Sequence, residues 1–95
     1  MSKTKLTKFD MADYLTTEKE IMGFLKAAIE DNDPEYLPHA LGVVARSIGM
    51  TKVAKKAGVT RANLYKAFSK GGNPEFITVL KVLDALGLKF SIAKA

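Results

Sequence analysis

The side chains with the clearest chemical potential lie in one short stretch, residues 51–72. This stretch carries six basic side chains and no acidic one. Arg61 can bond the O6 and N7 atoms of guanine together, and Asn63 can pair in the same way with adenine. Ala62, between them, can touch a thymine methyl group. The basic side chains are those of Lys52, Lys55, Lys56, Arg61, Lys66 and Lys70.

The same stretch supplies groups that suit phosphate oxygens. Lysine ammonium groups, hydroxyls and backbone amides are the usual protein partners of DNA phosphates. Such groups lie both before and after the three base-reading positions, so the sequence predicts a surface that binds double-stranded DNA. A lysine-rich face that only keeps a helical protein soluble is the alternative. The predicted DNA-binding residues are Thr51, Lys52, Lys55, Thr60, Arg61, Ala62, Asn63, Tyr65, Lys66 and Lys70.

Catalytic and metal-binding chemistry has little support in this chain. It has no cysteine and a single histidine, His39, whereas a metal site normally needs three or four donors. No serine lies in a nucleophile-elbow context. The glycine-rich residues 71–73 lack the Lys-Ser/Thr pair of a phosphate-binding loop. We therefore expect no catalytic residues, no cofactor and no metal, and we expect His39 to be a surface or partly packed side chain.

Two short helices joined by a tight turn would position the DNA-binding side chains. Apolar residues recur at helical spacing on both sides of Gly58, which suits the left-handed position of such a turn. Thr51 and Thr60 are placed to cap the two helices. Leu64 and Phe68 would face inward and hold the second helix on the core. Residues 51–68 thus predict a helix-turn-helix, whose second helix enters the major groove.

Three further helices are predicted around this unit. The first starts at a capping box between Thr17 and Glu20 and ends near residue 32. The second starts at the Asp-Pro-Glu signal of residues 33–35, with Asp33 as N-cap and Pro34 at the first helical position, and ends at Gly49. The third starts in the same way at residues 73–75, with Asn73 as N-cap, and ends at Gly87. We expect an all-α fold of about five helices, with an N-terminal arm over residues 1–13 and one domain over residues 14–95.

Residues 88–92 alternate apolar and polar side chains, which predicts a short C-terminal β-strand. No second strand is visible in the chain, and an unpaired strand leaves its backbone groups without partners. We expect it to pair with its twin in a homodimer or with the sheet of another protein. The alternative is an extended tail.

Charge and hydropathy limit the kinds of partner. The chain has 95 residues and a net charge of +5, yet residues outside the 51–72 stretch carry nine basic and ten acidic side chains. Positive charge concentrated in one stretch favours a polyanion. Residues 10–35 hold eight of the ten acids and are a candidate surface for a basic protein partner. No signal peptide or membrane-spanning run is visible, so we expect a cytoplasmic protein with no membrane partner.

Several segments resemble known families. Ala54, Gly58, Val59 and Leu64 occupy the small-residue, turn-glycine and packing positions of lambda-repressor/Cro-type (Xre-like) helix-turn-helix domains. A fuller set, spread over nearly the whole chain, resembles the addiction-module antidote family of HigA-like antitoxins. Its segments are FD and YL at residues 9–10 and 14–15, ALGVVAR at 40–46, GMT at 49–51, LYKAFS at 64–69 and GNP at 72–74.

This resemblance implies the antitoxin of a type II toxin–antitoxin system. Such a protein would bind its operator as a homodimer, repress its own operon and neutralise a RelE/ParE-like toxin of the HigB type. One departure matters: Xre-like repressors often carry Gln at the start of both motif helices, where this chain has Thr51-Lys52 and Thr60-Arg61. The base read by Arg61 or Asn63 therefore stays open. Two alternatives are a stand-alone Xre-like regulator without a toxin, and a protein-interaction module that has lost DNA binding.

Overall fold

The computed structural model describes residues 10–95, and over this range the chain is all-helical. A 3₁₀ turn, η2 (Met11–Tyr14), precedes five α-helices. These are α1 (Glu18–Glu30), α2 (Tyr36–Ile48), α3 (Met50–Ala57), α4 (Arg61–Ala67) and α5 (Phe76–Ala85). None of the helices in residues 10–95 is long and apolar enough to cross a bilayer.

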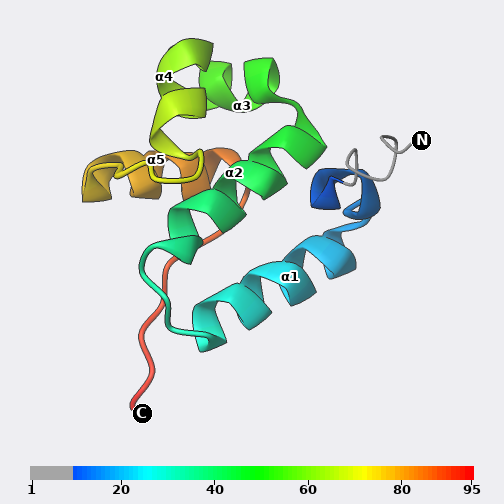
Figure 1. Cartoon of the computed structure of the whole chain (residues 1–95), viewed down its shortest axis with the longest axis vertical. Coiled ribbons are helices and arrows are strands. Elements are labelled where there is room, and N and C mark those ends of the chain that lie inside the picture. Colours follow the sequence, from blue (N-terminus) through cyan, green and yellow to red (C-terminus); the bar gives the residue numbers. More distant parts are fainter. Residues whose placement is uncertain (1–9) are drawn as a thin grey trace, which may run out of the picture.

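Helix α2 is the central element of the fold (Figure 1). It packs against η2 and α1 on one side and against α3 and α4 on the other, while α3 also packs against α5. Six consecutive residues of α2, from Ala40 to Ala45, are buried. A helix that is apolar around most of its circumference must be covered on several sides. This sequence pattern explains why α2 lies in the middle.

The core joins side chains from every helix. Leu25 and Ala28 of α1 meet the buried stretch of α2, and Val82 of α5 is fully buried. From α3 and α4, the buried side chains are Val53, Ala54, Ala57, Leu64 and Phe68, the last closing α4 at its C-terminal end. The inward positions predicted from helical spacing in residues 51–68 are therefore confirmed.

One glycine lets α2 approach the end of α4. A Cβ atom added at Gly42 would overlap the backbone carbonyl oxygen of Phe68. Gly72 is under the same restriction, because its added Cβ would overlap the carbonyl oxygen of Ala67. Two close backbone contacts thus fix the C-terminal end of α4, one to α2 and one to the loop that leads to α5.

Several predicted helix ends are confirmed. The Thr17 hydroxyl accepts from the Glu20 amide at 3.1 Å, and Glu20 Oε1 accepts from the Thr17 amide at 3.0 Å, so the capping box is complete. Gly49 ends α2 and Gly87, with φ at 78°, follows α5. The Leu88 amide then donates to the Leu83 carbonyl at 2.8 Å, which closes the last turn of α5.

The prediction that Thr51 caps the first motif helix is wrong. Helix α3 begins at Met50 with Gly49 as its N-cap and without a side-chain cap. The positive φ of Gly49, 127°, turns the chain directly from α2 into α3, so Thr51 already lies in the first helical turn. Helices α2 and α5 likewise start two residues later than predicted, with Glu35 and Glu75 rather than Asp33 and Asn73 as N-caps.

The β-strand predicted for residues 88–92 is not formed in the single chain. Residues 88–95 have no regular secondary structure, and no strand is present anywhere in residues 10–95. Instead Leu88 packs against the core, and the Phe90 ring meets the Phe76 ring edge-on with centroids 5.8 Å apart. A strand needs neighbouring backbone groups as partners, and α5 offers only side chains. The segment is therefore an extended tail that starts along α5.

Candidate nucleic-acid interface

Helices α3 and α4 form a compact pair joined by a tight turn. Gly58 adopts the left-handed conformation with φ at 74°, as its position predicted. The Val59 amide donates to the Ala54 carbonyl at 3.0 Å and the Gly58 amide to the Lys55 carbonyl at 3.3 Å, so the end of α3 is closed by backbone bonds. The chain then enters α4 after only two further residues.

Thr60 caps α4, as predicted. Its hydroxyl oxygen accepts from the Asn63 amide at 3.0 Å. A threonine hydroxyl can still donate its own hydrogen when its oxygen accepts in this way. Thr60 can therefore fix the start of α4 and at the same time offer a donor to a phosphate oxygen.

Burial on one side of α4 determines which side chains face solvent. Leu64 is only 1% exposed and Phe68 only 2%, so this face is held in the core. Ala62 and Lys66 lie roughly opposite Leu64, because successive helical residues rotate by about 100°. Asn63 and Tyr65 lie to either side, and Tyr65 is 60% exposed. Two buried anchors thus direct the polar face of α4 outward.

All ten residues predicted to bind DNA are exposed. Three of them lie on α3, one caps α4, five lie on α4 and one lies in the loop after it. These ten side chains lie within twenty residues of the sequence, and the structure brings them together on and around two neighbouring helices. In chain order they are Thr51, Lys52, Lys55, Thr60, Arg61, Ala62, Asn63, Tyr65, Lys66 and Lys70.

The charge on the α3–α4 pair is not neutralised within the chain. Across residues 10–95, the ion pair between Arg46 and Asp10 is the one salt bridge, and it lies outside this pair of helices. The six basic side chains of residues 51–72 are exposed and have no acidic neighbour in that stretch. Unpaired ammonium and guanidinium groups on an exposed surface attract polyanions.

A hollow of about 910 Å³ lies beside α4 and adds to this surface. It is bounded by one side of α4 and by the loop between α4 and α5, and its lining includes Asn63, Lys66, Lys70 and the acidic Glu75. Its position extends the polar surface of α4 toward the glycines at residues 71 and 72. A DNA backbone that runs along α4 would meet Lys66 and Lys70 beside this hollow.

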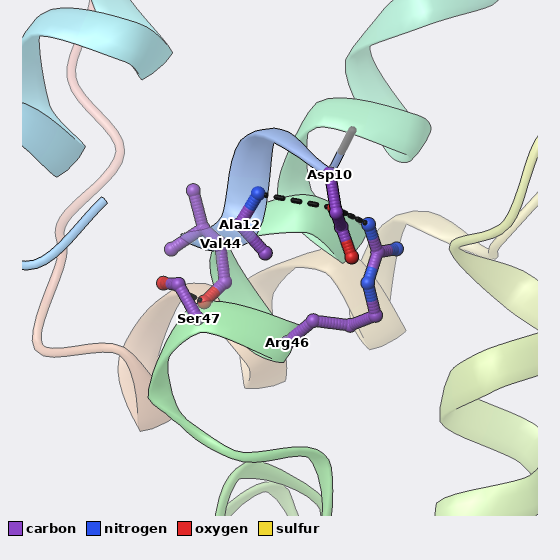
Figure 2. Close-up of polar contacts among 5 residues, drawn as sticks. All are labelled: Asp10, Ala12, Val44, Arg46 and Ser47. Carbon is purple, nitrogen blue, oxygen red and sulfur yellow. Dashed lines mark hydrogen bonds and ion pairs between the residues drawn. The ribbon is translucent and has the colours of Figure 1, made fainter. Parts of the chain in front are cut away.

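Asp10 and Arg46 form a long-range contact that the sequence did not predict (Figure 2). Asp10 Oδ1 accepts from Arg46 Nη2 at 2.7 Å and from the Ala12 amide at 3.1 Å. The hydrogen bond from Arg46, followed by that from Ala12, lowers the pKa of Asp10 from its usual value of 3.8. The contact ties η2 to the end of α2. Both residues belong to the segments that carry the family resemblance.

His39 is half-buried, as predicted, and its ring lies near Tyr36 with centroids 6.0 Å apart. Its Nδ1 atom is buried without a hydrogen-bond partner. Within residues 10–95, no three His, Cys, Asp or Glu side chains come together in a way that could hold a metal ion.

Fold and surface together define a small all-helical protein that presents an exposed basic helix pair. A family model described as "Probable addiction module antidote protein" matches residues 5–94. The chain therefore belongs to this family of addiction-module antidotes, the antitoxins of toxin–antitoxin systems, which implies a toxin partner. An uncharacterized protein of Haemophilus influenzae is 42% identical over 91 residues, which cover 96% of this chain and 94% of that protein. No solved structure matches this chain significantly.

Proposed function

We propose that this antitoxin binds its own operator as a dimer, represses its operon and neutralises a RelE/ParE-like toxin of the HigB type. The observation that carries the DNA-binding part is the α3–α4 pair. The pair and the loop after it, residues 51–72, expose six basic side chains and no acidic one, and the burial of Leu64 and Phe68 holds α4 in place. In this proposal the pair is a lambda-repressor-like helix-turn-helix of the HigA-like branch, and α4 enters the major groove.

The side chains of the proposed interface have separable roles. Arg61 and Asn63 at the start of α4 read base edges, and Ala62 lies close enough to the base pairs to meet a thymine methyl. Lys52 and Lys55 on α3 bind phosphates on one side of the groove. The phosphate contacts on the other side come from Tyr65, Lys66 and Lys70. Neutralising several phosphates makes affinity fall steeply as salt concentration rises.

Dimerisation is supported by an apolar face on α5. Phe76 and Ile77 are 62% and 60% exposed, and Phe90 of the tail, 54% exposed, lies against Phe76. Leu80 continues the same face one helical turn further along. Large apolar side chains clustered on a surface mark sites of association. We propose that two copies meet through this α5 face, which shares no residue with the α3–α4 interface.

Two substitutions test the proposed DNA interface. Arg61→Ala removes a base contact and should relax sequence preference at one operator position, at a cost of about 1–3 kcal/mol in binding free energy. Lys55→Ala removes a phosphate contact and should weaken binding to all sequences alike, with a salt slope smaller by about 1. Fluorescence anisotropy with operator and scrambled duplexes at several salt concentrations measures both effects.

Measurements of DNA binding and toxin binding also distinguish the proposed function from its two alternatives. If neither substitution changes DNA binding, the assigned reading face is wrong. Toxin binding without any DNA binding at low salt identifies a protein-interaction module that has lost its operator. Operator binding by a chain whose neighbouring gene encodes no toxin identifies a stand-alone regulator.

A further inference from the structure

A groove of about 690 Å³ lies away from the α3–α4 pair, on the N-terminal half of the molecule. It is lined by η2 and the start of α1, by the last residues of α2, and by residues that follow α5. Three segments far apart in the sequence therefore meet around it, at residues 12–22, 46–48 and 86–88. A cavity of this size accommodates several side chains of a binding partner.

Apolar side chains form part of the lining of this groove, here called its floor, and are partly open to solvent. Met22 of α1 is 42% exposed and Ile48 at the end of α2 is 36% exposed, and both line the groove. Ile21, Leu86 and Leu88 add half-buried apolar surface to it. The packing of residues 10–95 covers these side chains only in part. Such exposed apolar side chains in a hollow give a partner apolar surface to pack against.

The rim of the groove is acidic. Asp13 and Glu18 are exposed and line it. The basic side chain among its lining residues is Arg46, whose guanidinium donates to Asp10 at 2.7 Å. Because Arg46 is already paired with Asp10, the carboxylates of Asp13 and Glu18 give the rim a negative electrostatic potential. The groove therefore favours a ligand that combines apolar side chains with positive charge.

We propose that this groove receives a segment of the toxin in which apolar side chains are flanked by Lys or Arg. The proposal rests on the proposed function, since it names the surface by which the antitoxin holds its toxin. Two other occupants fit less well. DNA would be repelled by the acidic rim, and a second copy joined through the same groove by twofold symmetry would bring four carboxylates and no unpaired basic group into one interface.

The location of the groove has a consequence for the complex. None of its lining residues belongs to the ten residues of the proposed DNA interface. A toxin segment seated between η2, α1 and α2 thus leaves α3 and α4 free. The antitoxin should bind the toxin and its operator at the same time.

Variants with matched controls test this proposal on the full chain. Met22→Glu places a charge on the groove floor, while Ile29→Glu places the same charge on α1 outside the groove at a side chain that is 57% exposed. Asp13→Lys reverses a rim charge, and Glu30→Lys makes the same change at an exposed position outside the groove. Isothermal titration with the purified toxin encoded beside this protein measures Kd. Circular dichroism confirms that each variant folds.

Met22→Glu and Asp13→Lys should each raise the toxin Kd by about tenfold or more, as expected for a central interface position and a complementary charge. The controls should stay within about twofold, and operator binding should be unchanged in all four variants. Unchanged toxin affinity in folded Met22→Glu and Asp13→Lys overturns the proposal. So does a change in the oligomeric state of Met22→Glu with toxin affinity intact, which would identify a second copy as the occupant. If the unmodified chain fails to bind the toxin, the toxin-neutralising part of the proposed function is itself wrong.

Discussion

The carboxylate of Asp10 links the N-terminal turn to the central helix. It accepts from the Ala12 amide, which starts η2, and from Arg46 near the end of α2. The side chains are 41% and 31% exposed, respectively, for Asp10 and Arg46, so water screens their attraction. An exposed pair of this kind contributes about 0–1 kcal/mol. Its structural role is to hold η2, and with it one wall of the groove, against α2.

The stability of this contact should depend on pH in a defined direction. Arg46 and the Ala12 amide lower the pKa of Asp10 in the folded chain, so folding favours the ionised carboxylate. The contribution is therefore present above the usual pKa of 3.8 and is lost as pH falls through the lower pKa of the folded state. Asp10→Asn should reduce the free energy of unfolding by up to about 1 kcal/mol at neutral pH.

Urea unfolding measures the difference in free energy of unfolding between the parent chain and Asp10→Asn. It should be carried out at neutral pH and near the lowest pH at which the chain is folded. The difference should be present at neutral pH and shrink toward zero once Asp10 is protonated in the parent chain. Asp13→Asn, on the same turn but without an ion pair in the described part of the chain, is the matched control and should change stability little at either pH. An equal effect of both substitutions would mean that the Asp10–Arg46 contact contributes nothing specific.

At the scale of elements, close backbone packing fixes α4 against α2. Gly42 lies in α2, where alanine is normally preferred over glycine by about 1 kcal/mol. Its added Cβ, however, would overlap the Phe68 carbonyl oxygen, which is a backbone atom and cannot rotate away. The end of α4 would have to move outward. Because the same helix carries the proposed base-reading residues, packing at Gly42 also determines the position of that surface.

Gly42→Ala should therefore destabilise the fold by about 1–3 kcal/mol, the usual cost of overpacking. Gly23→Ala in α1 is the matched control, because an added Cβ there has no neighbour within 4 Å. It should stabilise the protein by about 0.5–1 kcal/mol through helix propensity alone. Urea unfolding curves measure both changes. A stabilising effect at both positions would contradict the packing argument.

Helix ends that are fixed by residues within a few positions could be predicted from the sequence. Structure that depends on how one element joins or pairs with another could not. The capping box at Thr17, the turn at Gly58 and the cap at Thr60 involve residues within a few positions of one another. The assignment of Thr51 as a cap was wrong because Gly49 leads directly into α3. The strand predicted for residues 88–92 is not formed in the single chain for a related reason. Alternating side chains do not supply the hydrogen-bonding partners that the backbone of a strand needs.

The same distinction applies to the candidate sites. Exposure of the ten residues on and around α3 and α4 follows from the helical spacing of the buried residues of each helix, Val53, Ala54 and Ala57 on α3, Leu64 on α4 and Phe68 at its C-terminal end, which the sequence displays directly. The groove joins residues near positions 12–22, 46–48 and 86–88. No local pattern connects these segments, so only the packing of α1, α2 and the tail could bring them together.

At the scale of the whole molecule, three kinds of surface are carried by different elements. The α3–α4 pair is basic, the groove beside η2 and α1 has an acidic rim over an apolar floor, and the exposed side of α5 is apolar. Only the third surface is both apolar and nearly balanced in charge, since residues 73–95 carry three basic and two acidic side chains. Such a surface can meet its own copy without repulsion, whereas the other two cannot.

Ile77→Asp should therefore convert the dimer that we propose into a monomer, because each copy would bury a new, unpaired carboxylate in an apolar interface. Two linked DNA-binding subunits bind far more tightly than one. Operator affinity should therefore fall by about 100-fold or more, although α3 and α4 are unchanged. Sedimentation velocity measures the association state, and fluorescence anisotropy measures operator binding. Ile29→Asp on α1, at a side chain with 57% exposure against 60% for Ile77, is the matched control and should leave both quantities unchanged. A dimer that survives Ile77→Asp would place the interface on another element.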